Sequence, residues 1–224
     1  SKTTKNLVIQ KYKDLTKQKK HYFQFIGPQP VTLTKESLSI TSPKSILVDY
    51  AVTEKADGDR YEMIVIDNHG YLLNSKQHVI DTGNTFPFLG GEWLFDGEYI
   101  TKDKDNNSIE LYMIFDVYYS GEYYSNLPQP IYTYPFMGNT PESIDRHTIL
   151  YECGNGMYHE MESVEGSIEI DIKEYECGYN WGLKPDDFDP RKLPEEDLMG
   201  IFEASERVLK KSENGDFPYR IDGL

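Results

Sequence analysis

The sequence predicts an α+β fold with mostly antiparallel sheets and flanking helices. Residues 49–120 alternate segments rich in Val, Ile and Tyr with short turn-like stretches, which is typical of strands joined as hairpins. Apolar residues at helical spacing occur near the C-terminus, at Leu198, Ile201, Phe202, Ala204, Val208 and Leu209. Strands in hairpins with helices outside them favour this class over an alternating parallel sheet.

Two hairpins are expected in the first half of the chain. In the first, covering residues 49–82, YAVTEKADGDRYEMIVID runs into the turn signal Asp67-Asn68-His69-Gly70 and YLLNSKQHVID follows. In the second, EWLFDGEYI follows Gly90-Gly91, and the polar residues 103–107 separate it from IELYMIFDVYY. A mostly antiparallel sheet follows from these pairings.

The second half is less regular. Residues 121–165 are rich in Pro, Tyr and Gly, and we expect one short helix at 141–150. GSIEIDIKEYE alternates as a further strand, and the turn-like KPDDFDPRKLPEED comes next. The C-terminal helix would end at Asn214-Gly215 and pack on the sheet.

Composition excludes several classes of protein. The 224 residues are 38% hydrophobic and 27% charged, too apolar for a disordered tail and too polar for a membrane protein. No apolar run approaches the roughly 18 residues that span a bilayer, and the N-terminus lacks a signal-peptide pattern. Cys153 and Cys177 lie outside any metal or redox motif and are expected to be reduced thiols. We therefore expect an intracellular protein with no membrane partner.

Charge is distributed unevenly along the chain. The formal net charge is −15, so the surface as a whole repels phosphates and any contact with nucleic acid must be local. Residues 1–20 nevertheless hold seven lysines against Asp14 alone. We interpret residues 1–29 as a basic lead-in segment, which is either a solvated linker, a lysine-faced helix or an arm that guides an RNA backbone.

The most informative chemistry begins at Lys55, in EKADGDR at the junction of a strand and a tight turn. A lysine acts as a nucleophile only when neutral, so its pKa of about 10.4 must fall through desolvation or nearby cations. Gly58 would let the backbone approach a ligand, and Arg60 could hold ribose or phosphate oxygens. A strand that ends in a charged turn without any such function would look similar.

Three further elements follow in order. Glu98 lies in LFDGEYI, on a strand that could bring the carboxylate back to the same pocket. Phe115 in MIFDVYY offers an aromatic face to a base, with Asp116 beside it. The chain closes on YRIDGL, where Asp222 is again followed by glycine. Together, and in this order, these elements indicate a functional site more specifically than any one of them does.

The order of these motifs resembles a known superfamily. KADGDR, FDGE, IFDV and IDGL are similar to motifs I, III, IIIa and IV of the covalent nucleotidyltransferases, which include mRNA capping guanylyltransferases and ATP-dependent ligases. IDGL after FPYR resembles the capping branch, and GPQPVTL with VDYAVTEKADGDRY resembles the capping enzymes of large DNA viruses, over roughly residues 30–224. The resemblance implies a nucleotidyltransferase domain of the ligase and capping type, unrelated to ATP-grasp, and a location in the host-cell cytoplasm or the virion.

Carried over by position, the resemblance implies a role for each motif residue. Lys55 would attack the α-phosphate of GTP, hold GMP covalently and pass it to the 5′-diphosphate end of an RNA. Arg60 would contact ribose and phosphate, and Phe115 would stack on the guanine. Glu98 and Asp222 would position ribose and the divalent cation, Mg²⁺ or Mn²⁺, for which carboxylates are suitable ligands. The match of Lys173 in IDIKEY is weak, and it is not included in the expected site.

Two alternatives to the guanylyltransferase function stay open. One is an ATP-dependent polynucleotide ligase, and the other is a scaffold that binds nucleotide or RNA without turnover. The family continues beyond motif IV into a motif V and an OB-fold carrying motif VI. We therefore expect residues 30–224 to be a nucleotidyltransferase domain that stops at motif IV, within a longer polypeptide that holds other capping domains.

Overall fold

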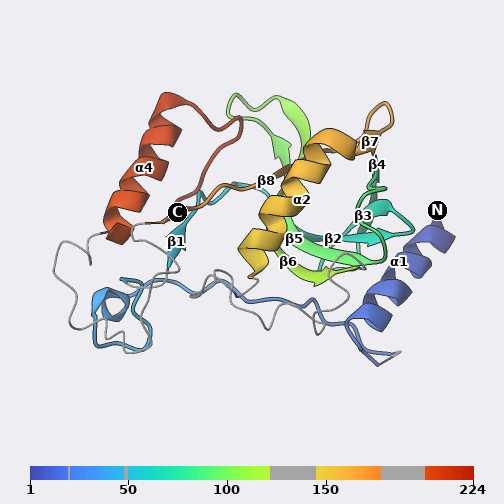
Figure 1. Cartoon of the computed structure of the whole chain (residues 1–224), viewed down its shortest axis with the longest axis horizontal. Coiled ribbons are helices and arrows are strands. Elements are labelled where there is room, and N and C mark those ends of the chain that lie inside the picture. The colour runs from blue at the N-terminus through green and yellow to red at the C-terminus, as the bar shows by residue number, and fades with distance from the viewer. Residues whose placement is uncertain (20, 48–49, 122–144, 178–199) are drawn as a thin grey trace.

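The computed structural model describes residues 1–19, 21–47, 50–121, 145–177 and 200–224, and it is of the expected α+β class (Figure 1). A curled sheet of seven strands forms its centre, in the order β7-β4-β3-β2-β5-β6-β8. Its strands are β2 (Asp59–Ile66), β3 (His69–Leu73), β4 (Val79–Thr85), β5 (Trp93–Lys102), β6 (Ser108–Ser120), β7 (Glu162–Ser163) and β8 (Glu169–Ile172). A separate two-stranded ladder joins β1 (Ala51–Val52) to β9 (Glu176–Cys177).

Both expected hairpins are present, but YLLNSKQHVID is divided between two antiparallel strands, β3 and β4, and does not form one. β2 and β3 pair antiparallel around Asp67 and Asn68, whose φ angles of 50° and 65° are those of a tight turn. β5 and β6 pair antiparallel beyond the polar turn, and β2 pairs with β5 at the centre of the sheet. β8 is shorter than its alternating sequence suggested and runs parallel to β6, the one parallel pair among the described strands.

Helices cover both faces of the sheet. The helices are α1 (Lys2–Leu15), the single 3₁₀ turn η1 (Lys35–Leu38), α2 (Arg146–Glu160) and α4 (Gly200–Asn214). α2 lies across one face and packs on β6 and β8, whereas α1 packs on β2 and β3 from the other side (Figure 1). α4 packs on β1 and β9 and ends at Gly215, whose φ of 79° is typical of a helix C-terminal glycine.

Because the sheet is covered on both faces, alternate residues of β2 enter different cores. Tyr61, Met63 and Val65 pack with α2, while Ile64 and Ile66 pack with α1. The basic N-terminal segment is therefore helical over Lys2–Leu15 and contributes Val8 and Tyr12, both fully buried, to the second core. Arg60, Asp96 and Glu98 face this same side by strand alternation.

Two other expectations concern the helices and the thiols. The helix expected at 141–150 begins at Arg146 and runs to Glu160; residues 141–144 and the turn-like segment 184–197 lie outside the described residues. Cys153 and Cys177 are both free thiols. In the described part of the chain, no helix is long and apolar enough to cross a membrane.

Candidate active site

Lys55 and Asp222, 167 residues apart in the sequence, are in direct contact. The Lys55 Nζ atom lies 2.5 Å from Asp222 Oδ2. The two backbones pair as well: Lys55 N–H donates to Gly223 O at 2.9 Å, Asp222 N–H donates to Lys55 O at 2.8 Å, and Ala56 bridges Ile221 antiparallel. This short ladder fixes the last acid of the chain beside the lysine.

The contact sets the charge state of both groups. The hydrogen bond to Asp222 raises the pKa of Lys55, with smaller contributions from the charges of Glu98 and Asp57, and it lowers the pKa of Asp222. The Lys55 amine is thus protonated in this form, and its side chain is 61% exposed. To act as a nucleophile it must give up both Asp222 and a proton, and a divalent cation bound at Asp222 would favour both changes.

Arg60 and Glu98 are directly opposite each other on β2 and β5. The Arg60 guanidinium is held by Asp96, with Nε 3.1 Å from Oδ1 and Nη2 2.5 Å from Oδ2, and Nη1 donates to Pro28 O at 3.0 Å. Asp96 is fully buried. The acid of the FDGE motif that precedes Glu98 therefore binds the expected nucleotide-binding arginine, a relation that the sequence analysis did not identify.

Gly58 and Glu98 are packed together. A Cβ atom on Gly58 would lie 2.6 Å from Tyr99 O and 3.0 Å from Glu98 Cγ, so only glycine lets the turn after Lys55 approach β5. Burial raises the pKa of the half-buried Glu98, while the Lys173 cation and the Gly58 backbone N–H oppose that rise. In the structure Gly58 serves close packing of the site's own backbone.

Lys173, which the sequence analysis left out, lies in the site. Its Nζ donates to Glu54 O at 2.8 Å, lies 3.6 Å from Glu54 Oε1 and stands 5.8 Å from the centroid of the Phe115 ring. Burial lowers the pKa of Lys173, and the charges of Glu54 and Glu98 oppose this shift. Glu54 directly precedes Lys55, so one buried ion pair links the lysine turn to the ring expected to stack on the base.

Phe115 is half-buried, and contacts to its backbone and to the next residue fix its place on β6. Tyr175 donates its hydroxyl to Phe115 O at 2.7 Å. The neighbouring Asp116 is not free for a ligand, because Arg146 at the start of α2 binds both its oxygens, at 2.7 and 3.1 Å. The acid beside the ring is therefore an anchor for α2.

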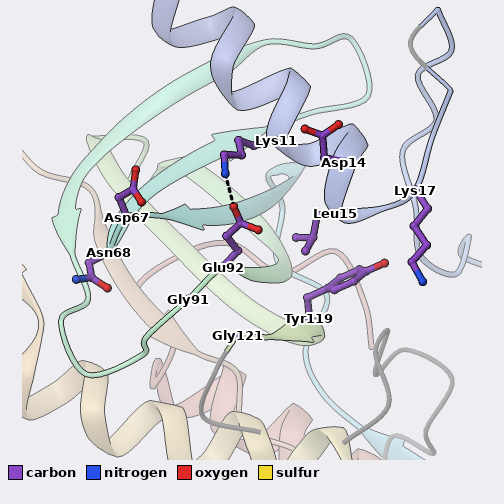
Figure 2. Close-up of a pocket in the computed structure, with 10 residues that line it drawn as sticks. All are labelled: Lys11, Asp14, Leu15, Lys17, Asp67, Asn68, Gly91, Glu92, Tyr119 and Gly121. Atoms are coloured by element: carbon purple, nitrogen blue, oxygen red, sulfur yellow. Dashed lines mark hydrogen bonds and ion pairs between the residues drawn. The ribbon is translucent and has the colours of Figure 1, made fainter. Parts of the chain in front are cut away.

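Three hollows of the described surface lie near Lys173 or beside α1. Lys173 lines two grooves, one of about 400 Å³ with Glu54 and Tyr219 and one of about 1000 Å³ against α2. A third hollow of about 920 Å³ lies between α1 and the strand ends, where Lys11 pairs with Glu92 at 2.6 Å (Figure 2). None of the expected site residues, Lys55, Arg60, Glu98, Phe115 and Asp222, lines any of these three hollows.

The donor set is suitable for a hard cation bound together with substrate. No group of three or more His, Cys, Asp or Glu side chains gathers among the described residues. The charges of Asp222, Glu98 and Asp57 all act on the Lys55 ammonium, and the first two are the acids of the expected site. Mg²⁺ commonly binds through one or two carboxylates, with water and substrate phosphates completing its ligands. Glu98 and Asp222 fit that pattern.

A curled, mostly antiparallel sheet whose two central strands carry Arg60 and Glu98, with Lys55 and Asp222 paired next to it, is that of a nucleotidyltransferase-type domain of the capping class. The family model described as "mRNA capping enzyme, catalytic domain" matches residues 1–129, more than half of the chain, and the chain belongs to this family. The matched region contains Lys55, Arg60, Glu98 and Phe115, and Asp222 lies beyond it. No curated protein matches the chain. Its function is accordingly in capping or nucleotidyl transfer.

Proposed function

We propose that the chain is an mRNA guanylyltransferase that carries GMP on Lys55. The observation that supports this most directly is the pairing of the Lys55 turn with the Asp222 segment, which puts an amine and an acid together across nearly the whole chain. Neither residue has a structural need for this contact, because both side chains are largely exposed. An exposed ion pair adds little to stability, so replacing Lys55 is expected to leave the fold intact.

The proposed reaction has two steps. The neutral Lys55 amine attacks the α-phosphorus of GTP, forming a P–N bond as the bond to the β-phosphate bridging oxygen breaks. Pyrophosphate leaves and the amine loses a proton to solvent. A terminal oxygen of an RNA 5′-diphosphate then attacks the same phosphorus, the P–N bond breaks, and the amine regains a proton. The products are GpppRNA and the free lysine.

The chain's residues supply positioning and charge. Arg60 is proposed to bind the ribose and phosphate oxygens, and Phe115 the face of the guanine. Glu98 and Asp222 would hold Mg²⁺ or Mn²⁺, which neutralises phosphate charge when bound. Phosphoryl transfer depends mainly on in-line placement and charge neutralisation, and these are the roles proposed for this set of groups.

The test uses nucleotides labelled at the α-phosphate. The full-length protein is incubated with labelled GTP or ATP and a divalent cation, then denatured, and the label on the chain is measured. Label from GTP is expected, and Lys55→Ala and Lys55→Arg should both abolish it in folded protein. Lys11→Ala is the matched control, since Lys11 also pairs with one acid, Glu92, but lies in the hollow of Figure 2.

Each other outcome identifies an alternative. Label from ATP in place of GTP would indicate a ligase-type enzyme, because the same lysine chemistry serves both. No label from either nucleotide, with nucleotide or RNA still bound, would indicate a scaffold without turnover. A normal adduct in either Lys55 variant would refute the assignment of the nucleophile.

A further inference from the structure

A buried polar cluster lies beneath Arg60 on the α1 side of the sheet. Asp96 is fully buried and accepts three hydrogen bonds, two from Arg60 and one from the hydroxyl of Tyr118 at 2.5 Å. Tyr118, on β6, is itself fully buried. Three adjacent strands, β2, β5 and β6, therefore contribute one member each to a single hydrogen-bonded unit.

The segment after α1 closes this unit from outside. Pro28 O accepts from Arg60 Nη1, and the Phe25 ring lies 5.6 Å from the guanidinium carbon. Gly27 has a φ of 97°, and a Cβ there would lie 2.4 Å from the Tyr118 hydroxyl. The chain can pass so closely over the unit only because this residue is glycine.

These contacts leave Arg60 with little freedom. A guanidinium carries five N–H donors. Asp96 and Pro28 take three of them, which leaves one on each Nη atom, and the side chain is only 22% exposed. The two remaining donors point in a direction that the protein fixes before any nucleotide arrives, and such pre-organisation reduces the ordering cost of binding.

Glu62 provides an internal comparison. It is directly opposite Asp96 on β2 and equally buried, yet neither of its carboxylate oxygens has a hydrogen-bond partner among the described residues. These two buried acids differ in their hydrogen bonds: Asp96 accepts from Arg60 and Tyr118, and Glu62 accepts from neither. Variants at these two positions therefore distinguish the loss of a contact with Arg60 from the loss of any buried acid.

We propose that Asp96 and Tyr118 are positioning residues that hold Arg60 in the orientation in which it binds the nucleotide, with Gly27 and Pro28 as the outer wall. This inference rests on the proposed function, since it assigns a supporting set to the arginine of that same site. It also makes the segment that follows α1 a part of the nucleotide site, although none of its residues was expected there.

Two matched pairs of variants test the proposal in the full-length protein. Asp96→Asn and Glu62→Gln make the same chemical change at neighbouring buried acids. Tyr118→Phe and Tyr61→Phe each remove one hydroxyl, and the Tyr61 hydroxyl bonds His78 on the other side of the sheet. The readouts are the limiting rate of GMP-adduct formation, the GTP concentration at half that rate, and thermal unfolding.

Tyr118→Phe should raise the half-saturating GTP concentration about 3- to 10-fold and Asp96→Asn about 10- to 100-fold, on the scale of lost hydrogen bonds to charged groups. The limiting rate should change less than threefold, because the lost contact acts on binding. Glu62→Gln and Tyr61→Phe should leave both kinetic quantities near wild type. If Asp96→Asn does not fold, the Tyr118 pair still decides the question.

A double-mutant cycle separates positioning from stability. In an Arg60→Lys background, Tyr118→Phe should have no further effect on the half-saturating concentration, because the group it orients is gone. An undiminished effect there, or equal effects of Tyr118→Phe and Tyr61→Phe, would overturn the proposal. If the wild type forms no adduct, the proposed function fails separately, and equilibrium binding of GTP to the same variants tests the positioning.

Discussion

If Phe115 stacks on the base as proposed, Lys173 would be a hydrogen-bond donor close to that base. Its amine lies over the Phe115 ring, 5.8 Å from the ring centroid, and already donates to Glu54. A lysine can only donate hydrogen bonds, and guanine presents two acceptors, O6 and N7, where adenine presents a donor at N6. A stacking ring alone accepts every base, so a fixed donor at this place would favour GTP over ATP.

We predict that Lys173→Met lowers the preference for GTP over ATP about 10-fold, the scale of one hydrogen bond from a charged donor. The measurement is adduct formation with each labelled nucleotide at matched concentrations. Lys211→Met is the control, since Lys211 lines the same groove and pairs with Glu174 and Glu176. An unchanged ratio in Lys173→Met would mean that the base edge is recognised elsewhere.

Glu62 should make stability depend on pH in a defined direction. Burial and the charge of Asp96 raise its pKa well above the usual value, against smaller opposing effects of Tyr12 on α1 and Arg60 on β2. The folded protein therefore keeps a proton that the unfolded chain loses near pH 4.3. Between about pH 4.3 and the higher pKa of Glu62 in the folded protein, the free energy of unfolding falls by about 1.4 kcal/mol per pH unit as the pH rises.

In the Glu62→Gln variant, this side chain does not titrate in either the folded or the unfolded state. The stability of the variant relative to wild type should therefore increase with pH from about pH 4 upward, as measured by urea unfolding at a series of pH values. A difference that stays constant with pH would show that Glu62 is ionised in the folded protein.

The residues that the sequence predicted are those with local motifs, and the ones it missed act through tertiary contacts. Lys55 and Asp222 each stand next to a glycine turn, so their chemistry was visible before their contact was. Asp96 lay within a recognised motif, but its bond to Arg60 depends on the register of β2 against β5. Lys173 follows a short strand whose parallel partner could not be identified from alternation alone.

At the scale of elements, the lysine-rich sequence of α1 gives little sign that one face of the helix is buried. The helix carries lysines along most of its surface, and its two fully buried residues, Val8 and Tyr12, are four apart. Their side chains pack with Ile64 of β2 and Leu73 of β3. The Tyr12 hydroxyl accepts from Ile26 N–H at 2.9 Å, so α1 also orders the segment that passes over Arg60.

We predict that Val8→Ala destabilises the protein by about 2 kcal/mol, from the lost burial of two methyl groups and the cavity left behind. Leu7→Ala, one residue earlier and 49% exposed, should change stability by less than about 0.5 kcal/mol. Urea unfolding of both variants gives the comparison. Equal, small effects would show that α1 contributes little to the folded core.

Elements with strong turn signals were predicted well and the others less so. Asp67-Asn68 and the polar turn after β5 marked two hairpins, and Asn214-Gly215 marked the end of α4, all as found. Alternation of apolar and polar residues did not identify β2 as a strand, because both of its faces are buried. The parallel pairing of β8 with β6 could not be anticipated, since strand direction depends on connections that leave no local pattern.

At the scale of the whole molecule, charge limits where an RNA can lie. The chain carries a net −15, so most of its surface repels a phosphate backbone. α1 and the turn after it are the basic exception in the sequence, and Lys2, Lys5 and Lys17 are exposed there. An RNA whose 5′ end reaches Lys55 would gain electrostatic attraction by extending toward α1.

We predict that the combined variant Lys2→Gln, Lys5→Gln and Lys17→Gln weakens RNA binding and leaves the GMP adduct formed with GTP unchanged. For single-stranded RNA, each lost phosphate contact should reduce the slope of log affinity against log salt by about 0.7, or about 2 for the three lysines. The control variant changes Lys76, Lys102 and Lys210 to Gln, three exposed lysines outside α1, with the same change in net charge. A smaller salt slope only in the α1 variant would locate the RNA backbone there. Equal effects of the two variants would mean that RNA responds to net charge alone and that the lysines of α1 form an ordinary solvated helix face.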